Sequence, residues 1–307
     1  MKILITGTDG FVGSNLKKYF IGAGFSVHGT VFVREPGADE TKIDIRHPDE
    51  LMKLKGMNFP VIIHTAGIVD QNAPKKLIFQ VNAEGTRNML QFAGTSGCSH
   101  FIQTSSVSVY GPKTLGEYRE ERTCRRNKGP LSIPYMKSKA IAEEHIERSG
   151  VPYTILRLPA VLGRNDSAIS GAIIPRLMNG SFYFCGKKDR LVSVICVKNL
   201  GSIMHRIINV GPQNDVFHCA DYHILWSEFI AEYAKLLNVP MPTSRKTIVS
   251  MLTNYGDKMF VLMVSFSYFG AHYRNDKLLE RFSWNPPFDW RGAVRDAVDG
   301  YLSKSNN

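Results

Sequence analysis

A tyrosine and a lysine four residues apart, Tyr135 and Lys139, are the residues whose types and spacing could do chemistry. They head an amphipathic run that continues to Ile146, so in a helix the two side chains lie on one face, one turn apart. An ammonium held near a phenol stabilises the phenolate and lowers a pKa that is ordinarily about 10. The pair therefore predicts a general acid/base that exchanges a proton with an alcohol or a carbonyl.

The same spacing occurs twice more, at Tyr183 with Lys187 and at Tyr273 with Lys277. A bare pair is also what a solvated helix face with ion pairs carries. The surrounding elements must therefore decide which pair is chemical.

A strand, a glycine turn and a helix are predicted at the start of the chain. Residues 2–6 are rich in β-branched side chains, and residues 14–20 have helical spacing. Between them, Gly7 allows a tight turn, Gly10 lets the backbone approach a pyrophosphate, and Gly13 lets the helix pack close to the strand. Because a helix N-terminus attracts negative charge, this context predicts a dinucleotide site.

The second predicted strand, residues 26–33, ends without the acid that takes the ribose hydroxyls in NAD-preferring proteins. The first acid after it is Glu35, and Arg34 could contact a 2′-phosphate instead. NADP(H) is therefore predicted over NAD(H), and the alternative is that Arg34 is a solvated loop residue. Asp44 follows the next short strand and is expected at the adenine edge.

Strands continue to alternate with helices, which predicts an α/β fold. We expect strands at 41–45, 60–64 and 100–104 and helices at 49–55 and 75–97. This alternation predicts a Rossmann-type doubly wound parallel sheet with a smaller C-terminal substrate-binding lobe. The expected division is 1–163 for nucleotide binding and 164–307 for substrate, with about 191–220 returning to the first sheet.

Ser106 follows the predicted strand at 100–104, so it should face the same cleft as Tyr135 and Lys139. A hydroxyl, a phenol and an ammonium at one place suit hydride transfer to or from a carbonyl. Ser106 would polarise the oxygen, Tyr135 would move the proton, and Lys139 would tune the tyrosine and hold the nicotinamide ribose.

With these motifs together, the sequence resembles the extended short-chain dehydrogenase/reductase family, the NAD(P)-dependent epimerase/dehydratase type. The resemblance spans roughly residues 1–220 and is carried by segments 6–13, 64–67, 82–86, 105–111, 135–139 and 156–163. It implies catalysis by Ser106, Tyr135 and Lys139, with Pro159 beside the nicotinamide. It also implies a homodimer through the helices at 75–97 and 135–149.

The turn and the resemblance together give a set of expected cofactor contacts. They are Gly7, Asp9, Gly10, Phe11, Val12, Gly13, Arg34, Asp44, Ile45, Thr65, Ala66, Gly67, Asn82, Thr104, Tyr135, Lys139 and Pro159.

Departures from family patterns bear on the reaction. Sugar-nucleotide 4,6-dehydratases of the family carry Thr-Asp-Glu where this chain has Ser106-Val107-Ser108, so the acid for that reaction is missing. Many sugar-nucleotide epimerases have an asparagine where this chain has Ala160. Residues 190–199 look more like the hydroxysteroid-dehydrogenase and dihydroflavonol-reductase branch.

The leading hypothesis is an NADPH-dependent reductase or dehydrogenase acting on a hydrophobic carbonyl or alcohol. The alternatives are a nucleotide-sugar 4-epimerase or 4-ketoreductase, and an NADPH-sensing regulator without turnover.

Composition indicates a globular protein. The chain has 307 residues, 43% hydrophobic and 21% charged, with a net charge of +11. No apolar run is long enough for a transmembrane helix, and five scattered cysteines lack metal-site spacing, so a reduced, cytoplasmic protein without metal is expected. The basic charge could suit nucleic acid, but no nucleic-acid-binding motif accompanies it, so that partner is not expected.

Two segments remain open. Residues 111–131 mix basic and acidic side chains and read as a solvated loop or as a flap over the site. Residues 259–270 are almost wholly apolar and read as core, or as a wall over a hydrophobic substrate that could rest on a membrane surface.

Overall fold

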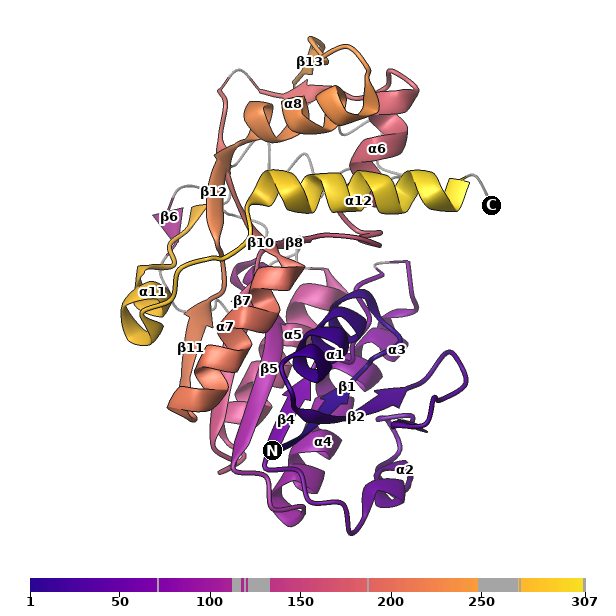
Figure 1. The fold of residues 1–307 in the computed structure, drawn as a ribbon, viewed down its shortest axis with the longest axis vertical. Coiled ribbons are helices and arrows are strands. Elements are labelled where there is room, and N and C mark those ends of the chain that lie inside the picture. Colours follow the sequence, from indigo (N-terminus) through magenta and orange to yellow (C-terminus); the bar gives the residue numbers. More distant parts are fainter. Residues whose placement is uncertain are drawn as a thin grey trace.

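A computed structural model describes residues 1–70, 72–111, 117–118, 120, 133–186, 188–247, 270 and 272–305. A large sheet flanked by helices forms one end of the molecule and a smaller lobe forms the other (Figure 1). Within these ranges, no helix has the length and apolar character needed to cross a membrane.

The large sheet has seven parallel strands in the order β11-β7-β5-β4-β1-β2-β3. Its strands are β1 (Lys2–Thr6), β2 (Ser26–Val31), β3 (Glu40–Lys42), β4 (Val61–His64), β5 (His100–Ser106), β7 (Tyr153–Leu158) and β11 (Asp215–His218). The order reverses between β1 and β4, which is the switch point where doubly wound folds bind ligands. The predicted Rossmann-type fold class is confirmed.

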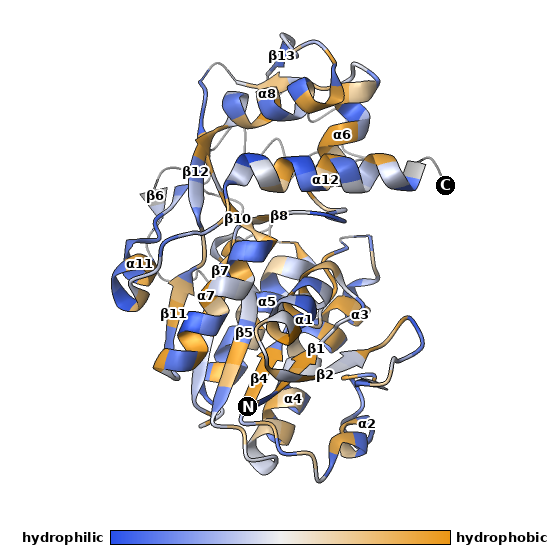
Figure 2. Cartoon of the chain, in the orientation of Figure 1, coloured by the Kyte–Doolittle hydropathy of each residue, from blue (hydrophilic) through white to orange (hydrophobic). Residues whose placement is uncertain are grey.

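Both faces of this sheet are buried, and β1 shows why. Its side chains alternate, so Ile3 and Ile5 pack on one face while Leu4 packs on the other. The first face is covered by α1 (Phe11–Gly22), α7 (Val197–Val210) and α11 (Asp276–Phe282). The second is covered by α2 (Pro48–Leu51), η1 (Met52–Leu54), α4 (Gly85–Thr95) and α5 (Pro134–Glu147). In Figure 2 the central strands β1 and β4 are correspondingly hydrophobic.

The helix expected at 75–97 is interrupted. It consists of α3 (Lys75–Phe79), the π-helical turn η2 (Gln80–Glu84) and α4. Single π turns inside helices often occur at functional sites. Here the turn carries Asn82, whose side chain is buried. A short 3-10 turn, η3 (Val107–Tyr110), follows β5.

The second lobe is built around a three-stranded sheet, β12-β10-β8, formed by β8 (Ala160–Leu162), β10 (Leu191–Cys196) and β12 (Tyr222–Leu225). Its apolar core includes side chains from α6 (Ser170–Met178), α8 (Trp226–Leu237) and α12 (Trp290–Ser305). Two short pairs complete it: β9 (Phe184–Cys185) with β13 (Arg245–Lys246), and β6 (Glu117–Tyr118) with β14 (His272–Tyr273). Within 191–220, β11 joins the large sheet and α7 packs on it, whereas β10 belongs to this second sheet.

The two open segments of the sequence, 111–131 and 259–270, fall almost entirely outside the described residues.

Candidate active site

The glycine turn between β1 and α1 forms a cradle for an anion. Gly7 has φ +71°, and a Cβ on Gly13 would lie 2.2 Å from the carbonyl oxygen of Gly7, so neither position tolerates a side chain without a shift. Gly10 caps α1 without a side-chain hydrogen bond, and the first turn carries no acid. The first amide groups of α1 are thus left for a ligand. This geometry fits the pyrophosphate of a dinucleotide.

The loop after β4 is fixed from two sides. The Thr6 hydroxyl accepts hydrogen bonds from the backbone amides of Thr65 and Ala66, both at 3.1 Å. Asn82 accepts from the Ile68 amide at 2.7 Å and donates to its carbonyl at 2.9 Å. Asn82, predicted as a cofactor contact, is 1% exposed and holds this loop in place instead of lining the cavity.

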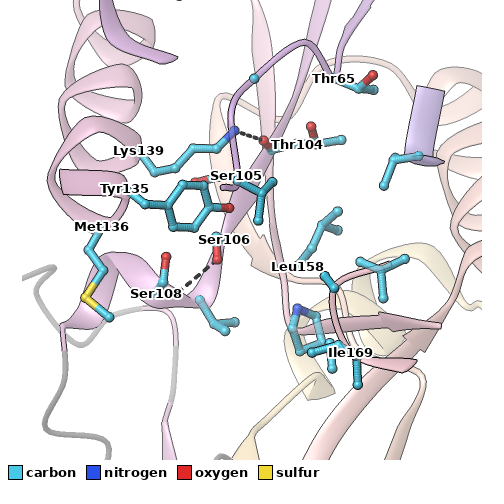
Figure 3. Close-up of a pocket in the computed structure, with 18 of the residues that line it drawn as sticks. Thr65, Thr104, Ser105, Ser106, Ser108, Tyr135, Met136, Lys139, Leu158 and Ile169 are labelled. Atoms are coloured by element: carbon cyan, nitrogen blue, oxygen red, sulfur yellow. Dashed lines mark hydrogen bonds between the residues drawn. The ribbon is translucent and has the colours of Figure 1, made fainter. Parts of the chain in front are cut away.

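Ser106, Tyr135 and Lys139 converge as the sequence predicts. The Tyr135 hydroxyl lies near Ser106, and Lys139 lies one turn further along α5 (Figure 3). The ammonium of Lys139 donates to the Thr104 carbonyl at 3.0 Å and is buried. Strand β5 supplies the serine and α5 supplies the other two side chains, so their spacing is fixed by the packing of α5 on the sheet.

The electrostatics differ from the expectation for Tyr135. Removal of water raises the pKa of the Tyr135 phenol, while the nearby Ser106 hydroxyl acts in the opposite direction. The expected lowering by Lys139 is not seen, because the ammonium points at the Thr104 carbonyl. Burial lowers the pKa of Lys139 to about 8, and the charge of Glu143 offsets part of that effect. At neutral pH the phenol therefore keeps its proton, as a proton donor requires.

A buried polar chain supports the site from behind. The Ser105 hydroxyl donates to Glu143 at 2.5 Å, and Glu143 forms an ion pair with Arg157 at 2.7 Å, with both side chains at most 6% exposed. Arg157 also donates to the Tyr110 hydroxyl at 2.7 Å, which in turn lies 2.6 Å from Nε2 of His218. Sequence reasoning missed this chain. Only Glu143 could have been found from the sequence, because it lies four residues after Lys139 and therefore on the same face of α5.

A cavity of about 260 Å³ opens beside these residues. The predicted residues that line it are Phe11, Val12, Thr65, Gly67, Thr104, Ser106, Tyr135, Lys139 and Pro159. Across from the polar residues, the lining is mostly aliphatic: Leu158, Ala160, Val161, Ala168 and Ile169 (labelled in part in Figure 3). Sequence reasoning anticipated an apolar substrate side but assigned it to other segments.

The predicted contacts at the adenine end are engaged with other protein groups. Arg34 donates to both carboxylate oxygens of Glu40, at 2.6 and 2.7 Å. Asp44 is paired with Arg46, and Asp9 accepts from the backbone amides of Phe32 and Val33. Arg34, the proposed 2′-phosphate contact, is therefore paired with Glu40 in the structure, with its side chain 47% exposed.

The other two tyrosine–lysine pairs lie elsewhere. Tyr183 packs under the ammonium of Lys246, and its own partner in the pattern, Lys187, is outside the described residues. Tyr273 reaches the cavity wall from β14, but Lys277 donates to Asp215 at 2.8 Å. Among the three pairs, as far as the described residues show, Tyr135 and Lys139 are the pair that lines the same cavity as Ser106 and the start of α1.

The strand order and the glycine turn define a Rossmann-type dinucleotide-binding protein. The chain belongs to the NAD dependent epimerase/dehydratase family, whose model matches residues 3–220, and is thus an extended short-chain dehydrogenase/reductase.

Named relatives agree with this membership. The chain is 28% identical over 254 residues to an N-acetyl-alpha-D-glucosaminyl-diphospho-ditrans,octacis-undecaprenol 4-epimerase of Escherichia coli O157:H7, covering 78% of this chain and 74% of that protein. It is 29% identical over 158 residues to 3 beta-hydroxysteroid dehydrogenase type 7 of Mus musculus, covering 46% and 42%. The crystal structure of the Bordetella bronchiseptica enzyme WbmG in complex with NAD and UDP has the same fold, with a TM-score of 0.78, 18% identity and coverage of 98% and 94%.

Proposed function

We propose that this protein catalyses hydride transfer between a nicotinamide cofactor and a secondary alcohol or carbonyl, with Tyr135 as the acid/base. The observation that carries the proposal is that Ser106, Tyr135 and Lys139 line one cavity together, with Tyr135 and Lys139 one helical turn apart on α5. The bound nicotinamide would supply and accept the hydride.

The protein's own groups handle the oxygen and its proton. The Ser106 hydroxyl is placed to donate a hydrogen bond to the substrate oxygen, which polarises the carbonyl. The Tyr135 hydroxyl gives its proton to that oxygen in reduction and takes it back in oxidation. Lys139, one helical turn from Tyr135, contributes an ammonium that can reach ribose hydroxyls. The aliphatic wall excludes water from the reacting carbon.

Two substrate classes are supported by different observations. A sugar carried on a diphosphate, epimerised at C4, is the first candidate, because a relative that covers 78% of this chain and 74% of its own length carries that name. A hydrophobic hydroxy or keto compound is the second, because the wall opposite Tyr135 is mostly aliphatic. A nucleotide-sensing regulator without turnover is the least supported, since all three catalytic side chains are present.

The cofactor is proposed to be NAD(H) and not NADP(H), because Glu40 occupies the Arg34 guanidinium. Mass spectrometry of the nucleotide released from purified protein tests the cofactor directly.

Incubation with UDP-sugars, followed by NMR of the C4 configuration, tests epimerisation. Absorbance at 340 nm with hydrophobic alcohols and ketones tests net redox turnover. Failure of both assays in protein that binds nucleotide would overturn the catalytic proposal.

The assembly and location stay proposals. A homodimer through the helices at 75–97 and 135–149 follows from the resemblance, and light scattering on the purified protein tests it. A cytoplasmic location is supported by the free thiols of the four described cysteines, Cys98, Cys185, Cys196 and Cys219. Fractionation of cells that express the tagged protein tests it.

A further inference from the structure

Glu40 is a buried carboxylate that collects several donors beside the glycine turn. It accepts from Arg34 twice, from Lys17 at 2.8 Å, from the Thr8 hydroxyl at 2.9 Å and from the Gly37 amide at 2.9 Å. Its side chain is 2% exposed, whereas that of Arg34 is 47% exposed. These donors, Arg34 first, hold the pKa of Glu40 well below its usual range, so the group is charged at any working pH.

The cluster lies where the adenosine ribose of a dinucleotide should be. Thr8 belongs to the glycine turn, and Arg34 is the third residue after β2. Asp9, also in the turn, accepts from the Phe32 and Val33 amides at 2.8 and 2.7 Å, which draws this loop onto the cradle. In this fold the residues after the second strand contact the ribose 2′ position, where an arginine can bind a phosphate.

Glu40 itself is too deeply buried to accept a hydrogen bond from the ribose. Its carboxylate instead pairs with both Arg34 and Lys17, and it accepts one hydrogen bond from each terminal nitrogen of the guanidinium. A 2′-phosphate would have to compete with this carboxylate for Arg34 and would add a like charge near it. A 2′-hydroxyl meets neither obstacle.

Resting on the proposed nucleotide-dependent function, we propose that Glu40 is a specificity-determining residue that selects NAD(H) over NADP(H) by sequestering Arg34 and Lys17. It acts through Arg34 and is thus a positioning residue. A merely structural Glu40 would affect the two nucleotides equally when replaced, so the ratio of their affinities distinguishes the two roles.

The test is isothermal calorimetry of NAD⁺ and NADP⁺ on full-length protein freed of any nucleotide that purified with it. Wild-type protein should bind NAD⁺ at least about tenfold more tightly, the equivalent of one charge-assisted hydrogen bond. Glu40→Gln should tighten NADP⁺ by about tenfold or more and leave NAD⁺ within about threefold. Adding Arg34→Met to Glu40→Gln should abolish the gain.

Glu35→Gln is the matched control, because it removes the same charge five residues before Glu40, at a side chain that is 84% exposed and paired with Lys42. It should leave the ratio unchanged. Wild-type protein that binds NADP⁺ as tightly as NAD⁺ would overturn the proposal, and this readout does not depend on the folding of any variant. Equal weakening of both nucleotides in Glu40→Gln would overturn it too. Wild-type protein that binds neither nucleotide would instead refute the function on which the proposal rests.

Discussion

The two walls of the cavity differ in polarity: one carries polar and charged groups, and the other is mostly aliphatic. The wall from β5 and α5 carries hydroxyl, phenol and ammonium groups, and buried charges stand behind it at Glu143 and Arg157. The wall from β8 and the following loop presents mostly aliphatic side chains. Its one acid, Asp166, is turned to the N-terminal end of α6, where it accepts from the amides of Ala168, Ile169 and Ser170.

This difference separates two tasks. The polar wall can move a proton and hold a charge, but its groups are already tied to one another. The aliphatic wall can shape the substrate without competing for the reacting oxygen. We therefore expect substitutions on the first wall to change kcat and stability, and substitutions on the second to change KM.

The largest effect is expected at Tyr135. Tyr135→Phe removes the proton donor while keeping the ring, so activity should fall by about 10²- to 10⁴-fold. Nucleotide affinity should change little, because the phenol hydroxyl is directed at Ser106. Steady-state turnover with whichever substrate proves active is the measurement. Tyr183→Phe, which alters another match to the same sequence pattern, should keep activity near wild type. Substantial activity in Tyr135→Phe would remove the chemical role from the polar wall.

The support behind this wall should matter next. Glu143→Gln leaves the Arg157 cation buried and unbalanced, which typically costs about 3–5 kcal/mol of unfolding free energy. Urea unfolding measures it. Replacing both partners, Glu143→Leu with Arg157→Met, should cost clearly less, because the Arg157 cation is no longer buried without its partner. If the double replacement proves as destabilising as the single one, the loss comes from packing and not from charge.

The glycine turn and the residues of the polar wall could be picked out from the sequence because they sit in local patterns. Gly7, Gly10 and Gly13 are needed by the backbone itself, and Tyr135 and Lys139 are neighbours on one helix. The strand alternation likewise predicted the sheet, because each strand of a parallel sheet is buried on both faces.

Long-range pairings were not predictable in the same way. Arg34 with Glu40 crosses from a loop to β3, and Glu143 with Arg157 joins a helix to a strand. No sequence spacing predicts either ion pair, because the two side chains of each pair are brought together only in the folded protein. The aliphatic wall was missed for a related reason: isolated residues such as Ala160 and Ile169 are indistinguishable from core until the cavity beside them is seen.

A pH-dependent effect is expected at Lys139. Its pKa in the folded protein is lowered to about 8, because burial disfavours the ammonium. The charged form therefore destabilises the fold below that pH, and the free energy of unfolding of wild-type protein should rise as pH increases from about 8 toward the ordinary lysine pKa of about 10.4. Lys139→Met should therefore be more stable than wild type by up to about 3 kcal/mol at pH 7. The Thr104 carbonyl would keep its second donor, Gln103.

Urea unfolding of both proteins between pH 7 and about pH 10 should show the difference shrinking as pH rises. Lys137→Met, on the same helix and less buried, controls for the loss of a lysine from α5. A constant difference across this range would mean that Lys139 does not titrate there, and the polar wall would then hold a permanent charge.

The smallest effect is expected on the aliphatic wall, and it discriminates between the two substrate classes. Ala160 lines the cavity, and the sequence resemblance places it where many sugar-nucleotide epimerases are expected to carry an asparagine. If the substrate bears a diphosphate, Ala160→Asn adds a hydrogen-bond donor and should lower KM by about fivefold, the equivalent of about 1 kcal/mol. If the substrate is hydrophobic, the same amide is buried without a partner and KM should rise by a similar factor. Steady-state kinetics with each substrate class gives the sign of the change in KM.

Ala168→Asn places an amide elsewhere on the same wall, so a matching change there would show that polarity in general, and not this position, sets KM. A change in kcat alone would break the separation of tasks between the two walls.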